Sequence, residues 1–107
     1  MRMTIGYWRE KKDPNSIKDI HARKLPWPED FITDNWQVGE KEAILKRLSD
    51  YDGEEIYMGY STCRICGCRN GDTEFYDNRF CWPEGLAHYV SEHNVKLLEF
   101  EEMMRET

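Results

Sequence analysis

The sequence predicts an α+β fold, in which a small antiparallel sheet is combined with short helices over 107 residues. Three observations lead to that class. Short segments alternate apolar with other residues, which is the period of a half-buried strand. Two further segments, 40–49 and 83–93, carry apolar residues at helical spacing. Turn signals such as Asn70-Gly71 separate the predicted strands.

The N-terminal third predicts one strand followed by irregular structure. Apolar residues alternate along 1–9, so this segment is expected to be a strand. Residues 11–16 form a turn signal with proline and asparagine, and 17–24 could form a short helical turn. Two prolines exclude a helix interior at 25–28. One short helical turn is expected around 28–34, because proline followed by acidic residues suits a first turn.

The middle of the chain predicts a helix and then a strand. The helix covers 40–49, where Ile44, Leu45 and Leu48 fall on one face. The Asp52-Gly53 pair breaks the helix, and the strand is expected at 56–62. The carboxylates around this break are interpreted as a solvated turn, and they are Asp50, Asp52, Glu54 and Glu55.

A hairpin and a second helix follow. Residues 74–76 and 79–82 are expected to pair around a turn at Asp77-Asn78. The helix is expected at 83–93, with proline at an early position and Asn94 as a left-handed C-cap. The remaining tail, 97–107, is expected either to pack its apolar residues onto the body or to fray.

The composition indicates a small, compact domain. Charged residues make up 34% of the chain and the mean hydropathy is −0.86, yet 13% of the residues are aromatic. That aromatic content is too high for a disordered chain. We therefore expect a single domain, 1–107, in which an N-terminal strand and helix (1–56) pack on a metal-binding unit (57–96), followed by the tail.

The net charge of −6 is unevenly spread. Residues 1–28 carry seven Lys/Arg and three Asp/Glu, whereas 29–56 carry three Lys/Arg and nine Asp/Glu. An acidic domain repels phosphate, so nucleic acid is a disfavoured partner unless the basic N-terminal third binds it. No apolar run is long enough to span a membrane and no signal-peptide core follows Met1, so the expected location is the cytoplasm.

Four residues form a candidate metal site. Cys63 and Cys66 have the Cys-x2-Cys spacing, and His88 and His93 follow on the second predicted helix. In a reducing compartment these cysteines are better interpreted as metal ligands than as disulfides. Mixed sulfur and imidazole donors favour zinc, which is expected here as Zn²⁺ in a closed, structural site.

Two details of this ligand set remain open. Cys68 or Cys81 could replace a histidine, and the alternative for both is a small buried apolar residue. Residues five apart on an ideal helix differ by about 140° around its axis. His88 and His93 can therefore face one ion only if the helix tightens or ends at His93.

The order of a Cys-x2-Cys turn, a hairpin and a helix with two histidines resembles the zinc-finger ββα unit. The resemblance covers 63–93, and it departs from the family in spacing. Such fingers have about twelve residues between the second cysteine and the first histidine, whereas residues 67–87 make 21 here. An elongated hairpin at 74–82 could take up the difference. The string CRICG…NG…EF…WPEGLAHYV..H also resembles a family of small uncharacterised bacterial and phage proteins.

These observations predict a non-catalytic adaptor or regulator that binds another protein. The candidate anchors are exposed aromatic residues, and for each the alternative is burial in the core. They are Trp8, Trp27, Trp36 and Tyr60. The second hypothesis is an RNA or single-stranded DNA binder that uses the basic residues and aromatics of the N-terminal third. No phosphate-binding loop, nucleophile elbow or His-Glu-x-x-His motif indicates an enzyme.

Overall fold

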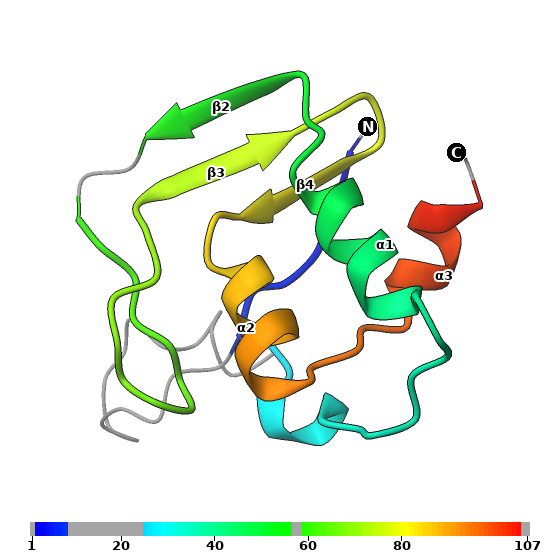
Figure 1. The fold of residues 1–107 in the computed structure, drawn as a ribbon. Coiled ribbons are helices and arrows are strands. Elements are labelled where there is room, and N and C mark those ends of the chain that lie inside the picture. The colour runs from blue at the N-terminus through cyan, green and yellow to red at the C-terminus, as the bar shows by residue number, and fades with distance from the viewer. Residues whose placement is uncertain (1, 9–24, 57–58, 106–107) are drawn as a thin grey trace.

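The computed structural model describes residues 2–8, 25–56 and 59–105 (Figure 1). The fold is α+β, as predicted, with a small four-stranded sheet and short helices. In chain order the elements are β1 (Met3–Thr4), the 3-10 helix η3 (Pro28–Phe31), α1 (Glu40–Leu48), β2 (Gly53–Ile56), β3 (Thr73–Tyr76), β4 (Phe80–Pro83), α2 (Leu86–His93) and α3 (Glu99–Met104). No helix in the described ranges is both long and apolar enough to cross a membrane.

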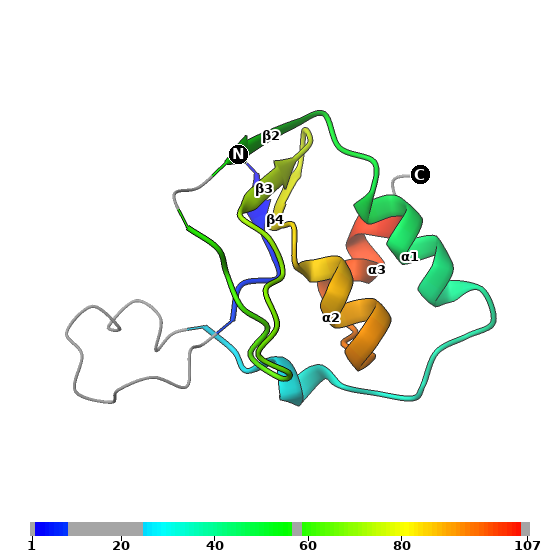
Figure 2. The same ribbon diagram turned by 60° about the vertical axis from the view of Figure 1, so that its left-hand side comes forward.

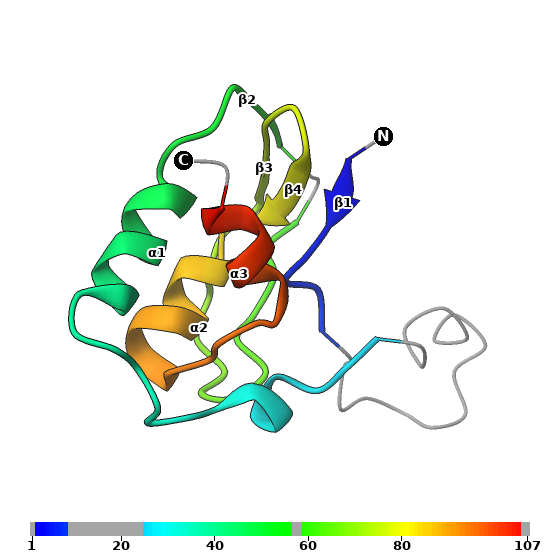
Figure 3. The ribbon, with the colours of Figure 1, turned by 90° about the vertical axis from the view of Figure 1, so that its right-hand side faces the viewer.

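The sheet is mixed, which corrects the expectation of a wholly antiparallel sheet. Its strand order is β1-β4-β3-β2, with β2, β3 and β4 antiparallel and β1 parallel to β4. Figure 3 shows β1 beside β4, at the edge opposite to β2. Parallel pairing requires a long crossover between the strands. A local sequence pattern does not specify such a crossover, so the direction of β1 could not be predicted.

The helices α1, α2 and α3 gather on one side of the sheet (Figure 2). Strand β4 alternates buried and half-buried residues, and its buried Phe80 and Trp82 are each 1% exposed. Leu86 and Val90 of α2 and Ile44 of α1 complete the same core. The core cluster comprises Ile5, Trp8, Ile44, Leu48, Cys63, Phe80, Trp82, Leu86, Tyr89, Val90, Val95, Leu97, Phe100 and Met103. One core therefore joins the sheet to all three helices.

The predicted hairpin is confirmed. Strands β3 and β4 pair through Tyr76 with Cys81 and Phe75 with Trp82. In the turn, Asp77 Oδ1 accepts hydrogen bonds from the backbone N–H groups of Arg79 and Phe80, each at 2.8 Å. The carboxylate thus replaces backbone partners within the turn, which is why aspartate suits this position.

Several helix boundaries also follow the predictions. The helix predicted at 40–49 is α1, and the short helical turn predicted around 28–34 is η3. The second helix was expected from residue 83 but begins at Leu86, because Pro83 still belongs to β4. The tail does not fray over its described part, since it forms α3.

Two strand predictions are wrong in position. The strand expected at 56–62 is β2 at 53–56, so Glu54 and Glu55 lie in an exposed edge strand rather than in a turn. The strand begins at Gly53, where a Cβ would lie 2.4 Å from the Tyr76 ring, so the position favours glycine. In the segment 1–9, strand pairing covers Met3–Thr4 within the described part. The turn and helix predicted for 11–24 lie outside the described residues.

Candidate metal centre

The Cys-x2-Cys turn forms a small hairpin of its own, which we call the knuckle (residues 61–71). An isolated bridge pairs Thr62 with Arg69 at its base. Inside it, the Cys63 N–H donates to the Cys68 carbonyl at 2.8 Å, and the Gly67 N–H donates to the Cys63 carbonyl at 2.9 Å. Gly67 has φ +79°, a left-handed conformation that glycine adopts without strain. This turn fixes the backbone from which the two cysteines project.

The sulfur of Cys63 accepts hydrogen bonds from two backbone amides of the knuckle. Its side chain is 2% exposed, and its Sγ lies 3.4 Å from the Ile65 amide nitrogen and 3.5 Å from the Cys66 amide nitrogen. Both amides donate toward the sulfur. Hydrogen bonds to a ligand sulfur fix its orientation.

Helix α2 supplies the two imidazoles, and its two ends explain how they reach one point. At its start Gly85 lies against Asn70 of the knuckle, where a Cβ would come within 2.5 Å of the Asn70 side chain. At its other end Asn94 has φ 56°, and its N–H donates to the Tyr89 carbonyl. The helix therefore ends directly after His93, as the five-residue spacing of the histidines required.

The structure brings the four predicted metal ligands together. One donor atom from each of Cys63, Cys66, His88 and His93 lies within 4.8 Å of every other. The His88 and His93 rings have centroids 5.0 Å apart and an interplanar angle of 76°. Two thiols and two imidazoles at this spacing could hold a metal ion.

One atom of this cluster lacks a protein partner. His93 Nε2 is buried and makes no hydrogen bond to any described residue. A buried polar atom without a partner destabilises a fold by about 1–3 kcal/mol. A metal ion at the centre of the cluster would satisfy this nitrogen, so the donor set fits an ion on energetic as well as geometric grounds.

Tyr89 ties the helix to the knuckle. Its hydroxyl oxygen accepts a hydrogen bond from the Arg64 backbone N–H at 2.7 Å, and its side chain is 3% exposed. Burial is the largest cause that raises the pKa of Tyr89 to about 12, so the phenol stays neutral. This contact was not predicted from the sequence. Its only signal was the position of Tyr89 directly after His88.

A third sulfur borders the cluster. Cys68 Sγ lies 3.3 Å from Cys66 Sγ, and each of the two sulfurs lies 3.4 Å from His88 Nε2. The Cys68 backbone N–H, followed by the side chains of His93, Cys68 and His88, lowers the pKa of Cys66 to about 5. The interaction with Cys66 and partial burial raise the pKa of Cys68. Of these two thiols, Cys66 is therefore the one held ready as a thiolate ligand.

The other alternative ligand takes no part in the cluster. Cys81 lies in β4, and its Sγ is 3.1 Å from Thr4 Oγ1 on the neighbouring strand β1. Of the two cysteines that could have replaced a histidine ligand, Cys68 thus lies beside the predicted ligands and Cys81 lies on the sheet.

The four candidate anchor residues differ in exposure. Trp8 is a core residue, 6% exposed, with ring centroids 5.8 Å from Phe31 and 5.5 Å from Tyr89. Trp27 and Trp36 are half-buried. Tyr60 is 62% exposed. Trp8 therefore stabilises the fold and offers no exposed ring to a partner.

Comparisons with known proteins give no family. The chain matches no protein-family model, and neither the curated proteins nor the solved structures gave a significant match. The resemblances to the zinc finger and to the bacterial and phage proteins therefore stay predictions, and the function has to be argued from the site.

Proposed function

We propose that this protein binds one structural Zn²⁺ through Cys63, Cys66, His88 and His93 and acts as a non-catalytic adaptor or regulator. The observation that carries the zinc proposal is the convergence of these four donors within 4.8 Å. The buried, unpartnered Nε2 of His93 supports it. Zinc suits two thiolates and two neutral imidazoles in a tetrahedron, because it imposes no redox chemistry on the sulfurs.

A structural role follows from the number of donors. Four protein ligands fill a tetrahedral site, whereas catalytic zinc sites keep one position for water or substrate. The ion would also join two segments that are far apart in the chain, the knuckle and α2. Zinc in such a position stabilises the fold directly.

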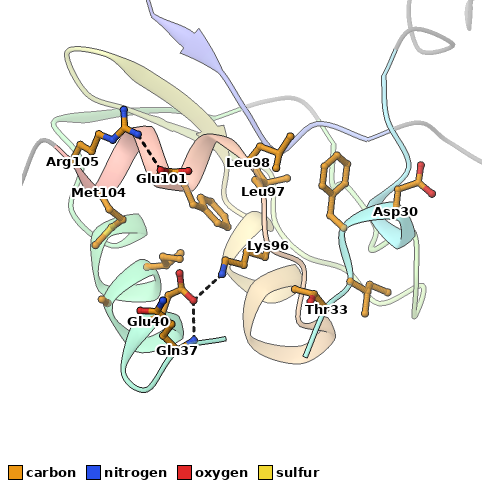
Figure 4. Close-up of a pocket in the computed structure, with 15 residues that line it drawn as sticks. Asp30, Thr33, Gln37, Glu40, Lys96, Leu97, Leu98, Glu101, Met104 and Arg105 are labelled. Atoms are coloured by element: carbon orange, nitrogen blue, oxygen red, sulfur yellow. Dashed lines mark hydrogen bonds and ion pairs between the residues drawn. The ribbon is translucent and has the colours of Figure 1, made fainter. Parts of the chain in front are cut away.

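The adaptor role is supported by a groove whose lining includes none of the four proposed zinc ligands. The groove lies between η3, α1 and α3, has a volume of about 850 Å³, and is shown in Figure 4. Apolar side chains, including Phe31, Leu97 and Phe100, line it. Its two cations are each paired with a carboxylate of the same lining, with Lys96 2.8 Å from Glu40 and Arg105 3.0 Å from Glu101.

Such a surface suits an apolar side chain of a protein partner better than a phosphate. Its cations are already neutralised, so they offer little to an anion. Leu98, which also lines the groove, is 78% exposed. Exposed apolar residues at a concave surface are typical of protein interfaces.

The adaptor proposal is tested with a matched pair of variants. The tagged protein is recovered from cells of its source and its partner is identified by mass spectrometry. Leu98→Glu should abolish recovery of the partner, because it places a charge in the apolar groove. Val38→Glu is the control, since Val38 is fully exposed and outside the groove. Equal recovery with both variants would show that the groove is not the binding surface.

One observation favours the second hypothesis, which is single-stranded nucleic acid binding. The Arg69 guanidinium lies 4.7 Å from the ring centroid of the exposed Tyr60, a pair that could stack on a base. Most basic residues of the N-terminal third lie outside the described residues. A gel mobility shift at low salt separates the hypotheses. Binding that Arg69→Ala weakens and Arg105→Ala leaves unchanged would favour nucleic acid, and no shift for the unmodified protein would exclude it.

A further inference from the structure

Cys66 and Cys68 form a close pair of thiols at the edge of the metal centre. Their sulfurs are 3.3 Å apart, and both side chains are exposed. The bonded distance in a disulfide is about 2.05 Å, so the two sulfurs need to approach by little more than one ångström. Between them lies Gly67, whose φ of +79° turns the backbone so that the flanking side chains meet.

We propose that Cys66 and Cys68 are a peroxide-sensitive pair, which forms a disulfide and thereby opens the zinc site. This inference rests on the proposed zinc binding. A tetrahedral ion takes four donors, and Cys68 is a fifth donor beside them. The proposal therefore gives Cys68 a role other than that of a ligand.

The surroundings of the other two cysteines single out this pair. Cys63 is 2% exposed, and amide donors surround its sulfur. Cys81 lies on the sheet, with its sulfur against Thr4. An oxidant in solution therefore meets Cys66 and Cys68 first, and each of these finds the other as its nearest thiol.

The chemistry balances with a peroxide as the oxidant. The Cys66 sulfur attacks one oxygen of hydrogen peroxide, the O–O bond breaks, and a sulfenic acid forms while the other oxygen leaves as water. The Cys68 sulfur then attacks that sulfur and gives up its proton, the S–O bond breaks, the S–S bond forms, and the second oxygen leaves as water. Two thiols lose two electrons and two protons, and one peroxide becomes two waters.

The disulfide removes one zinc ligand. Zinc is held by thiolate sulfur, and a disulfide sulfur carries no negative charge to offer it. Three donors would remain, namely Cys63, His88 and His93. The affinity for zinc should therefore fall on oxidation and return when a dithiol reduces the bond.

The experiment treats the zinc-loaded full chain with hydrogen peroxide and follows three signals. Zinc content is measured before oxidation, zinc release is followed with a chromogenic chelator, and the disulfide is located by peptide mapping without reduction. The expected result is a chain lighter by two hydrogens, a disulfide between Cys66 and Cys68, and zinc release that a dithiol reverses. A disulfide between other cysteines, or oxygen added to the unmodified chain, would overturn the inference.

Two variants complete the test. Cys68→Ser should hold zinc before oxidation, and under peroxide its Cys66 should gain oxygen atoms, so that the loss of zinc becomes irreversible. Cys81→Ser should behave like the unmodified protein. Loss of zinc from Cys68→Ser before any oxidation would make Cys68 a ligand and overturn the inference. If the unmodified protein takes up no zinc before peroxide is added, the proposed function itself is wrong. This outcome is distinct from those that overturn the inference about Cys66 and Cys68.

Discussion

Two turns of this protein satisfy their polar atoms in opposite ways. In the β3–β4 turn, the Asp77 carboxylate accepts hydrogen bonds from two backbone amides and lies 2.5 Å from the Arg47 guanidinium. In the knuckle and the end of α2, donor atoms of the cluster converge on one another, and His93 Nε2 has no partner among the described residues. The first turn is completed by groups of the protein itself, and we propose that the second is completed by an ion.

The two regions also differ in how much apolar surface they bury. The strand after the first turn supplies Phe80 and Trp82 to the core. In the described part of the knuckle, Cys63 is the one fully buried residue. Since the hydrophobic effect scales with buried apolar area, the knuckle gains little stability from packing. We therefore expect the stability of the knuckle to depend on the proposed metal ion, whereas the hairpin turn is completed by side chains of the protein.

The largest effect should come from removing the metal ligands. Cys63→Ala or His88→Ala should unfold the domain, because structural zinc supplies on the order of 10 kcal/mol in small zinc modules. That is comparable with the whole stability of a typical domain, about 5–15 kcal/mol. Thermal melts followed by circular dichroism, with zinc and with excess chelator, measure it. Cys81→Ala is the control, and a cooperative, native-like melt of either ligand variant without metal would contradict the account.

A smaller effect, independent of metal, is expected in the hairpin. Asp77→Ala should lower the free energy of unfolding by about 2–3 kcal/mol, because it leaves two amides and one guanidinium without their acceptor. Denaturant unfolding of the zinc-loaded protein measures the loss. Asn78→Ala in the same turn is the matched control, since Asn78 is exposed. If Asp77→Ala also weakened zinc binding by a similar free energy, the hairpin turn and the metal centre would not be independent.

Acid should weaken both regions. Burial alone would raise the pKa of Asp77, but hydrogen bonds from Arg79, Arg47 and Phe80 outweigh it and lower that pKa. The ionised Asp77 therefore contributes its full stabilisation at a pH above about 3.9, the pKa of an aspartate in the unfolded chain. This contribution is lost as the pH falls below that pKa and through the lower pKa of the folded state. Protons also compete with zinc for thiolate and imidazole ligands, so acid weakens metal binding.

In an acid titration, zinc release should be accompanied by unfolding of the domain, because we propose that the ion holds the knuckle to α2. Chelator absorbance reports the release, and circular dichroism reports the unfolding. Asp77→Asn is the control, since this substitution leaves the four proposed ligands in place. Zinc release from a chain that stays folded would contradict a structural role for the ion.

The smallest effect is expected at the contact between the two ligand-bearing segments. Tyr89→Phe removes the acceptor of the Arg64 backbone N–H and should cost about 1 kcal/mol of stability. Partners that orient a ligand segment typically change metal affinity by about 10–100-fold, and we expect the lower end here. Competition with a chelator of known affinity measures the change. Tyr51→Phe, at an exposed ring stacked on Phe75, is the control and should leave zinc affinity unchanged.

Features that depend on residues close together in the chain could be predicted. The hairpin follows from alternating residues around Asp77-Asn78, and helix α1 follows from the spacing of Ile44, Leu45 and Leu48. The convergence of the ligand atoms was predictable because Cys-x2-Cys spacing and a helix that ends at Asn94 are both local signals.

Features that depend on distant segments could not. The parallel pairing of β1 with β4 joins residues at opposite ends of a long crossover. The requirement for glycine at the start of β2 comes from the Tyr76 ring of the partner strand, which a Cβ at Gly53 would meet at 2.4 Å. The Arg64–Tyr89 hydrogen bond and the 3.3 Å contact between Cys66 and Cys68 also arise from the folded backbone rather than from a sequence pattern.

The most direct test of the metal centre is native mass spectrometry of the gently purified full chain, before and after chelation. The account predicts one zinc ion per chain and a shift to the high charge states of an unfolded chain once the zinc is removed. A chain that carries no metal and keeps the compact, low charge states of a folded protein would contradict it.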